Sequence, residues 1–318
     1  MNIFKPEVFQ GINKKKDYFE GWYYKHVSAA QDQVYAFIPG ISLTVNDPHS
    51  FIQVINGLSG ETHYVAYDKD QFTWEKNKLH IRVGDSLFTE DFIELDINEP
   101  TIKIKGTLTY QGLSKYTKTV LSPGIMGWYS YMPFMECYHG IVSANHFIDG
   151  SLNINSKTVD FSRGKGYIEK DWGTSFPECW IWLQSNSFQK PDASLFVSIA
   201  KIPWLGKFFM GFIAFVYLDG RYYKFATYNN SRLGEVKMHG PFLEIEMENK
   251  KYKLSTRVNT KNSGELIAPE RGNMSRRIKE SIDSEVEVTL SDKKGNVIFK
   301  DESKRAGLEI IDRIFDYL

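Results

Sequence analysis

The chain has 318 residues, of which 42% are apolar, 25% are charged and 15% are aromatic. Its 39 lysines and arginines balance 39 aspartates and glutamates, which argues against a nucleic-acid partner, because such proteins usually carry a basic excess. Only two cysteines occur, Cys137 and Cys179, so neither a disulfide framework nor a cysteine metal site is indicated, and a reducing cytoplasm fits.

The N-terminus and the most apolar stretch bear on location. Residues 1–6 lack the apolar core of a signal peptide. The stretch 204–218 is only about half to three quarters of a bilayer span and contains Lys207 and two glycines. We interpret this stretch as a buried strand approached by a loop, in a cytoplasmic protein for which peripheral membrane contact stays open.

The aromatic content favours β structure, because aromatic side chains suit strands and line apolar cavities. Short alternating runs, broken by Gly, Asn and Asp at intervals of roughly ten residues, predict a meandering antiparallel sheet. In chain order the predicted strands are 34–38, 51–55, 78–83, 92–97, 101–110, 180–184, 195–200, 212–218, 221–227, 242–247, 251–258 and 286–290. The residues at 219–220 and 294–296 suit positive φ and predict hairpin turns.

Helical periodicity is sparse along the chain. Met274, Ile278 and Ile282 recur every four residues, which predicts one short amphipathic helix. Residues 308–318 are expected to begin as a strand and to end in a helical turn.

A faint internal repeat divides the chain. Glu-Gly-Trp-Tyr-Tyr at 20–24 is echoed by Glu-Cys-Trp-Ile-Trp at 178–182, with Trp22 and Trp180 lying 158 residues apart. Chance in an aromatic-rich chain explains a single echo equally well, but the matched strand rhythms favour two similar β units. The sequence therefore predicts an all-β protein with an N-terminal domain over 1–160 and a C-terminal domain over 161–318.

Common catalytic signatures are missing from the sequence. There is no Gly-x-Gly-x-x-Gly, P-loop, Gly-x-Ser-x-Gly or His-Glu-x-x-His motif. The seven histidines show no close metal-ligand spacing, so no metal site is predicted. Cys137 and His139 share a face in extended chain, but a thiol nucleophile needs an activating environment that a sequence does not show.

Three aromatic-dense segments remain as candidates, at 18–25, 123–140 and 166–186. Alternate residues of a strand share a face. This rule groups Glu169 with Asp171, groups Glu20 with Trp22 and Tyr24, and groups Trp180 with Trp182 and Gln184.

These segments resemble the tocopherol cyclase family. The resemblance rests on Phe-Glu-Gly-Trp-Tyr-Tyr-Lys at 19–25 and, most specifically, on Tyr-Ile-Glu-Lys-Asp-Trp-Gly-Thr-Ser-Phe-Pro-Glu-Cys-Trp-Ile-Trp-Leu-Gln-Ser-Asn at 167–186. Pro-Phe-Met-Glu at 133–136 and Ala-Gly-Leu-Glu-Ile at 306–310 match more loosely. The family is related to two-domain lipocalin-like proteins that include carotenoid hydratases, which implies two lipocalin-like antiparallel β-barrel or sandwich domains with few short helices.

The resemblance implies closure of a chromanol ring without a metal or an organic cofactor. An acid protonates a trisubstituted alkene of a prenyl chain, and a phenol oxygen captures the tertiary cation. A carboxylic acid in an apolar pocket has a raised pKa and stays protonated near neutrality. Aromatic faces stabilise the cation by roughly 0.5 to 2 kcal/mol each.

The resemblance also nominates site residues. Glu169 is the first choice for the acid and Asp171 the second, although plant-like members tend to have Asn at the position of Asp171. Glu136 lies at a matching position with His139 nearby. The expected lining of the cavity consists of Trp22, Tyr24, Trp172, Trp180 and Trp182, with Gln184 orienting a phenol. The alternative is a purely structural role, in which these carboxylates form ion pairs and the aromatic residues pack in the core.

Three functions stay open at this point. The first is a tocopherol cyclase-like isomerase that acts on an apolar small molecule, such as a prenylated phenol. The second is a non-catalytic lipid or isoprenoid carrier, since barrel interiors hold one small ligand. The third is a hydratase or another cyclase of the same superfamily. The Lys- and Asn-rich composition looks bacterial, so the substrate need not be a tocopherol precursor.

Overall fold

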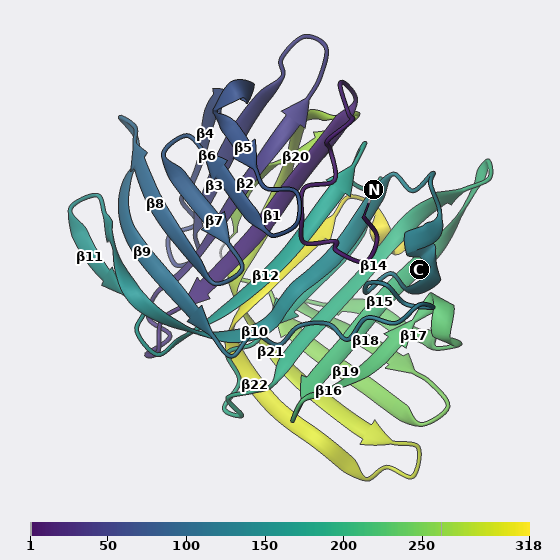
Figure 1. Ribbon diagram of the computed structural model, residues 1–318. Coiled ribbons are helices and arrows are strands. Elements are labelled where there is room, and N and C mark those ends of the chain that lie inside the picture. Colours follow the sequence, from purple (N-terminus) through teal and green to yellow (C-terminus); the bar gives the residue numbers. More distant parts are fainter. Residues whose placement is uncertain (1, 262) are drawn as a thin grey trace. The chain divides into compact units, whose positions relative to one another are not determined.

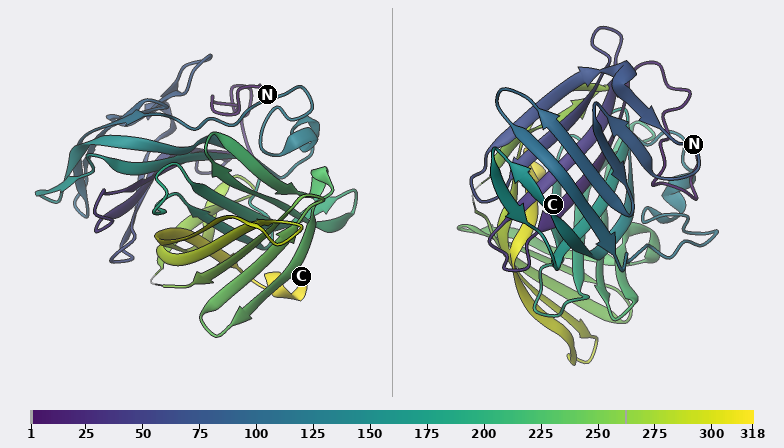
Figure 2. Two further views of the ribbon diagram at one scale, coloured as in Figure 1. Left: turned by 90° about the horizontal axis from the view of Figure 1, so that it is seen from below. Right: turned by 60° about the vertical axis from the view of Figure 1, so that its left-hand side comes forward.

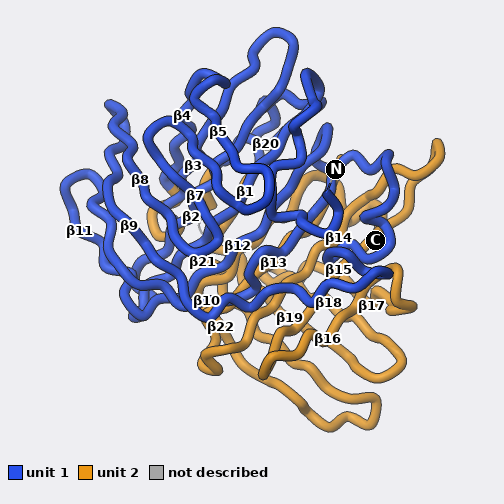
Figure 3. Tube along the Cα trace, viewed as in Figure 1, with its two compact units in different colours: residues 1–56, 61–176, 265–278 blue, residues 57–60, 177–264, 279–318 orange. Residues whose placement is uncertain are grey.

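The computed structural model describes residues 2–261 and 263–318, which form two antiparallel β-sheets (Figure 1). The chain divides into two compact units, coloured separately in Figure 3. Unit 1 comprises residues 1–56, 61–176 and 265–278, and unit 2 comprises residues 57–60, 177–264 and 279–318. The all-β prediction is therefore confirmed.

The first sheet belongs to unit 1. Its strand order is β4 (Thr62–Asp68), β3 (His49–Asn56), β2 (Val34–Leu43), β1 (Tyr18–Val27), β12 (Gly164–Gly173), β10 (Cys137–Ile154), β9 (Lys103–Gln111), β8 (Phe92–Asn98), β7 (Ser86–Thr89), β6 (His80–Val83) and β5 (Phe72–Trp74), while β11 (Lys157–Asp160) pairs with β10. Figure 2 shows the purple-to-teal strands of this sheet side by side in one curved layer.

The second sheet consists mainly of strands of unit 2, although most of β20 and the first residues of β21 are assigned to unit 1. Its order is β16 (Arg221–Ala226), β15 (Lys207–Leu218), β14 (Ser194–Trp204), β13 (Trp180–Ser185), β22 (Val297–Ile311), β21 (Asn273–Asp292), β19 (Tyr252–Asn259), β18 (Phe242–Glu248) and β17 (Arg232–His239), while β20 (Gly264–Glu270) pairs with β21. A core of buried aliphatic and aromatic side chains, among them Ile181, Leu183 and Val288, covers one face.

The two sheets share a strand order, which bears on the sequence echo. In each, the first strand of the unit (β1 or β13) leads a four-strand meander on one side and pairs on the other with a strand from late in the unit (β12 or β22). The echoing segments at 20–24 and 178–182 lie in or immediately before these equivalent first strands. The repeat therefore marks two units of similar topology.

The boundary between the two units lies further along the sequence than the predicted boundary at residue 160. Strand β12 pairs with β1 and β10 along its length, so residues up to 176 belong to unit 1. Residues 265–278 also belong to unit 1, although they follow most of unit 2 in the sequence. A boundary predicted only from the spacing of strands along the sequence cannot take such long-range pairing into account.

The helix predicted over 274–282 is wrong, because these residues lie in β21. A spacing of four residues fits two periods of a strand as well as one turn of a helix, and Ile278 and Ile282 are buried on one face of β21. Among the described residues the only helices are short 3₁₀ turns, η1 (Lys69–Gln71), η2 (Gly127–Tyr131), η3 (Thr227–Asn229) and η4 (Ile314–Asp316). The strand followed by a helical turn at the C-terminus is confirmed by β22 and η4.

No helix in the described part of the chain is long and apolar enough to cross a membrane.

A buried ion pair ties β12 to β1 inside unit 1. Lys170 of β12 pairs with Glu20 of β1, and both side chains are fully buried. The ammonium of Lys170 lies 4.7 Å from the ring centroids of both Trp22 and Trp172, a cation–π arrangement. Burial raises the pKa of Glu20 and lowers the pKa of Lys170, and their mutual attraction opposes both shifts.

The same pair holds the N-terminal segment. Glu20 accepts hydrogen bonds from the backbone N–H groups of Gln10 (2.8 Å) and Gly11 (3.0 Å) and from the hydroxyl of Tyr18 (2.5 Å). Lys170 donates to the carbonyl oxygens of Pro6 (2.8 Å) and Val8. Each charge is thus hydrogen-bonded as well as paired, which is the condition for a buried charge to be tolerated.

We expect Lys170→Met to destabilise unit 1 by about 3–5 kcal/mol, because it leaves the carboxylate of Glu20 buried without its cation. The double variant Glu20→Gln/Lys170→Met removes both charges and should recover much of that loss. Urea unfolding followed by tryptophan fluorescence measures both. If Lys170→Met lowers the free energy of unfolding by less than about 1 kcal/mol, the range of an exposed ion pair, the stabilising role assigned to the buried pair is contradicted.

Candidate functional site

Strand β12 lies between β1 and β10 and carries the predicted acids. Glu169 and Asp171 share one of its faces, as predicted, and Lys170 occupies the other. In the register, Asp171 is opposite His139 of β10, and Glu169 is opposite Ile141 of β10 and Tyr23 of β1. Pairing with β10 therefore brings together residues that are 28 or more positions apart in the sequence.

Four side chains meet on this face, and we call them the His139 group: His139, Tyr167, Glu169 and Asp171. Nδ1 of His139 lies 2.8 Å from Oδ1 of Asp171, and its Nε2 lies 3.7 Å from Oε2 of Glu169. The hydroxyl of Tyr167 donates to the same Glu169 oxygen over 2.5 Å. Glu169 and Tyr167 are buried, and His139 and Asp171 are partly buried.

The electrostatics of the group favour a charged imidazole. Burial lowers the pKa of His139, but the nearby carboxylates of Asp171 and Glu169 outweigh it and raise this pKa from 6.5 to about 9. Burial, with the charge of Glu169, holds the pKa of Tyr167 well above its usual value. Near neutral pH the group thus contains an imidazolium that contacts two carboxyl groups and a phenol that stays protonated.

Cys137 lies beside this group on β10. Its Sγ is 3.8 Å from Oδ1 of Asp171. Burial first, and then the charge of Asp171, raises the pKa of the thiol well above its ordinary value. A thiolate nucleophile needs the opposite environment, so the geometry argues against nucleophilic catalysis by Cys137.

The His139 group also offers possible metal ligands. One ligand atom each from His139, Glu169 and Asp171 lies within 4.8 Å of the others. One imidazole and two carboxylates form a donor set that suits several divalent metals. Because Nδ1 and Nε2 of His139 face the two carboxylates, a cation would have to displace a proton that these carboxylates stabilise. His139, Glu169 and Asp171 were all predicted as site residues from the family resemblance, but their spacing in the sequence did not indicate metal ligands.

The structure places three predicted lining residues away from Glu169. Trp22, Tyr24 and Trp172 lie on the Lys170 face of the sheet and pack in the interior of unit 1. Trp22 donates to the carbonyl of Glu7 over 2.9 Å, Tyr24 stacks near Tyr110, and Trp172 stacks on Tyr138. The alternation of side chains along β1 and β12 keeps them off the face that carries the acids.

Glu136 is also separate from the His139 group. Its side chain is exposed, and it immediately precedes β10. Its backbone carbonyl accepts hydrogen bonds from the N–H groups of Thr174 (2.8 Å) and Ser175 (3.3 Å). Gly173, with φ +152°, lies against that carbonyl, where an added Cβ would approach it to 2.0 Å. The segment therefore positions the end of β12.

Within unit 2, the remaining predicted residues share one face of β13. Trp180, Trp182 and Gln184 are all buried there. The indole N–H of Trp180 donates to Glu309 of β22, and Glu309 is opposite Trp182 in the register. Trp182 packs over Gly307, where an added Cβ would come within 2.5 Å of the indole.

Sequence reasoning missed two polar residues that contact predicted ones. Tyr167 lies two positions before Glu169, and the alternation rule applied to that segment would have placed it on the same face. Glu309 lies in the 306–310 segment that matched the family loosely, although its role as partner of Trp180 depends on the pairing of β13 with β22.

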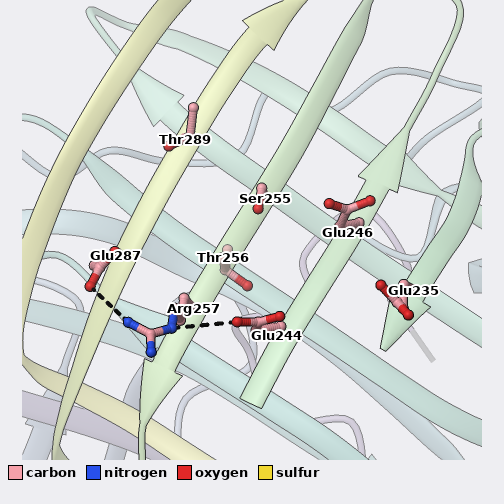
Figure 4. Close-up of a pocket in the computed structure, with 8 residues that line it drawn as sticks. All are labelled: Glu235, Glu244, Glu246, Ser255, Thr256, Arg257, Glu287 and Thr289. Atoms are coloured by element: carbon pink, nitrogen blue, oxygen red, sulfur yellow. Dashed lines mark ion pairs between the residues drawn. The ribbon is translucent and has the colours of Figure 1, made fainter. Parts of the chain in front are cut away.

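A hollow of about 240 Å³ is lined by residues of β17, β18, β19 and β21 in unit 2 (Figure 4). Its lining comprises Glu235, Glu244, Glu246, Ser255, Thr256, Arg257, Glu287 and Thr289. Arg257 lies 3.4 Å from Glu244 and 3.6 Å from Glu287. Carboxylates dominate this lining, which does not suit an apolar ligand, and none of the predicted site residues takes part.

Comparison with known proteins gives distant relatives and similar folds. The chain is 26% identical to the chloroplastic tocopherol cyclase of Zea mays over 147 residues, which is 44% of this chain and 30% of the maize protein. The chloroplastic probable tocopherol cyclase of Oryza sativa subsp. japonica matches at 25% identity over 44% of this chain and 31% of its own length. The alignment therefore spans about a third of these curated relatives.

Solved structures extend the likeness to nearly the whole chain. CghA superposes with a TM-score of 0.58 at 10% identity, covering 92% of this chain and 88% of CghA. Kievitone hydratase from Nectria haematococca superposes with a TM-score of 0.52 at 9% identity, covering 95% of this chain and 93% of the hydratase. At these identities the likeness shows the fold.

A family profile settles the relationship. The profile described as tocopherol cyclase-like matches residues 98–311, which is more than half of the chain and includes the whole His139 group. The resemblance found in the sequence is thereby confirmed, and the chain belongs to the tocopherol cyclase-like family.

Proposed function

We propose that the chain is an isomerase that closes a ring on an apolar isoprenoid, such as a prenylated phenol, by protonating an alkene. The observation that carries the proposal is the buried carboxyl group of Glu169, held by Tyr167 and facing the imidazole of His139. Family membership supports this chemistry, and the identity of the substrate belongs to the proposal.

The proposed reaction begins with Glu169 in its protonated form, one proton more than the resting group holds, in which the carboxylates of Glu169 and Asp171 face the imidazolium of His139. Its carboxyl proton passes to one alkene carbon, and the other carbon becomes a tertiary cation. The phenol oxygen attacks that cation and forms the new C–O bond, and the phenol proton returns to the carboxylate of Glu169. Atoms and charge balance without an oxidant, a reductant or a second substrate.

His139 tunes this acid. An imidazolium 3.7 Å from Glu169 stabilises the carboxylate that remains after proton donation, so it strengthens the acid. Asp171 holds the imidazolium in place through the 2.8 Å contact with Nδ1. Tyr167 fixes the carboxyl orientation, and the rings of Tyr167 and Tyr23 are electron-rich neighbours of the face where the cation would form.

A non-catalytic isoprenoid carrier is the second candidate. It is favoured by the same contacts, because a carboxyl group that is already hydrogen-bonded and faces an imidazolium is also what a purely structural polar cluster looks like. A carrier would bind the same apolar molecule and release it unchanged. Trp180, Trp182 and Gln184 stay predicted ligand contacts under either function.

We expect Glu169→Gln to lower turnover by about 10²- to 10⁴-fold, because the amide keeps the hydrogen bond to Tyr167 but cannot donate an acidic proton. The protein is incubated with a cell lipid extract, and mass spectrometry identifies bound molecules and any isomer formed. Glu136→Gln, a change at an exposed carboxyl outside the His139 group, is the matched control. A ligand that both the wild type and Glu169→Gln bind and leave unchanged would sink the isomerase proposal and favour the carrier.

The raised pKa of His139 predicts a pH-dependent stability. Because this pKa is about 9 in the folded protein and 6.5 otherwise, His139 stabilises the fold fully below about pH 6.5, and this contribution is lost as pH rises through 9. Its size is on the order of 3 kcal/mol. Urea unfolding between pH 6 and pH 10 should show the decline in the wild type and a much smaller one in His139→Gln. Equal declines in both proteins would contradict a charged His139.

A further inference from the structure

The hairpin between β14 and β15 extends past its neighbours. The two strands pair from Ala200–Gly211 to Trp204–Lys207 at the turn. On one side β13 pairs with β14 no further than Ala200, and on the other β16 pairs with β15 only from Ile213 onward. Residues 202–211 therefore form a two-stranded ribbon beyond the sheet, which we call the 202–211 ribbon (Figure 1).

This ribbon is apolar, whereas hairpins that project from a sheet are usually polar. It has one charged residue, Lys207, and no acidic residue, and its other side chains are Ile202, Pro203, Trp204, Leu205, Phe208, Phe209 and Met210, beside two glycines. At its tip Leu205 is 80% exposed and Phe208 is 49% exposed. An exposed apolar surface on a marginally stable element marks a place of interaction.

The turn itself carries a strained residue at the most exposed position. Leu205 has φ +49° and Gly206 has φ +78°, the backbone of a two-residue turn for which Asn-Gly or Gly-Gly is usual. A bulky side chain at positive φ is unfavourable, whereas asparagine is tolerated there. Folding alone therefore does not explain a leucine at this position, and strain of this kind is retained at functional sites.

The base of the ribbon is braced, so its tip has a fixed direction within unit 2. Lys201 lies 2.6 Å from Glu178, and its ammonium is 4.7 Å from the ring of Phe208 and 4.1 Å from the ring of Tyr317. Phe208 and Tyr317 also meet edge to face at 5.4 Å. Phe208 is thus held on one side by Lys201 and Tyr317 and stays half-exposed near the turn.

The chemistry of the tip fits a lipid surface better than a strand-pairing partner. Pro203 has no backbone N–H to offer, which blunts the edge of β14 against an added strand. Tryptophan is enriched at the level of lipid headgroups, leucine and phenylalanine partition into the acyl region, and a lysine beside them meets headgroup phosphates. We propose that the 202–211 ribbon inserts its tip into the surface of an anionic phospholipid bilayer. This proposal goes beyond the reaction described above and does not depend on it.

Vesicle binding by the full chain tests the proposal. Wild-type protein should co-sediment with unilamellar vesicles of phosphatidylcholine and phosphatidylglycerol, and added salt should weaken the binding. Leu205→Asn should reduce the bound fraction by about tenfold, because it removes the apolar group that enters the bilayer. Val297→Asn is the matched control, since Val297 is 59% exposed beside the turn that joins β21 to β22, and this variant should bind vesicles as the wild type does.

Unfolding in urea separates lost binding from lost structure. Asparagine suits the positive φ of position 205, so Leu205→Asn should unfold at an equal or higher urea concentration than the wild type. Failure of the wild type to bind vesicles, or equal binding by Leu205→Asn, would overturn the proposal. A dimer that forms without lipid and is lost in Leu205→Asn would also overturn it, because the ribbon would then meet a second copy of the chain.

Discussion

The buried pair of Glu20 and Lys170 is the constraint on which the arrangement of unit 1 depends. It joins β1 to β12 at one register, and its hydrogen bonds hold residues 6–11 against the same face. Because side chains alternate along a strand, fixing Lys170 in the interior places Glu169 and Asp171 on the opposite face. A shift of one residue would bury the two acids in the aromatic interior and move Lys170 away from Glu20, and the desolvation of unpaired charges makes that arrangement prohibitive.

The two faces of β12 differ in how their charged side chains are paired. On the interior face one cation and one anion are enclosed by aromatic rings and fully satisfied, which is a structural solution. On the other face two carboxyl groups share one imidazole, so the charges do not cancel and the proton on His139 is held by electrostatics. A histidine whose pKa is shifted this far by its charged neighbours marks this face as a candidate site for proton transfer. The account of function therefore rests on the second face and the account of stability on the first.

Much of the fold follows from sequence patterns, and the reasons differ by element. Strands β8 and β9 show clean alternation because one face is exposed, whereas β1, β12 and β13 are buried on both faces and stand out by aromatic density instead. The alternation rule placed Glu169 with Asp171 correctly. It could not place Trp22 and Tyr24 relative to those acids, because the orientation of one strand against the next is set by register and not by local pattern.

Residues joined by pairing between distant strands were the hardest to predict. His139 meets Asp171 only because β10 pairs with β12, and Trp180 meets Glu309 only because β13 pairs with β22. The four-residue spacing of Met274, Ile278 and Ile282 was interpreted as a helix for a related reason. The spacing fits both one helical turn and two periods of a strand, and only the pairing of β21 with its partner strands shows that the second applies.

The most direct test of the central claim is to run the reaction in heavy water and to locate deuterium in the product. A substrate with a prenyl chain on a quinol is incubated with the protein, and the cyclised product is examined by mass spectrometry and NMR after back-exchange of its O–H groups. Protonation by Glu169 predicts one deuterium on the carbon next to the newly bonded one, since the acid equilibrates with solvent before each turnover. A ring product without carbon-bound deuterium would contradict alkene protonation and with it the role assigned to the His139 group.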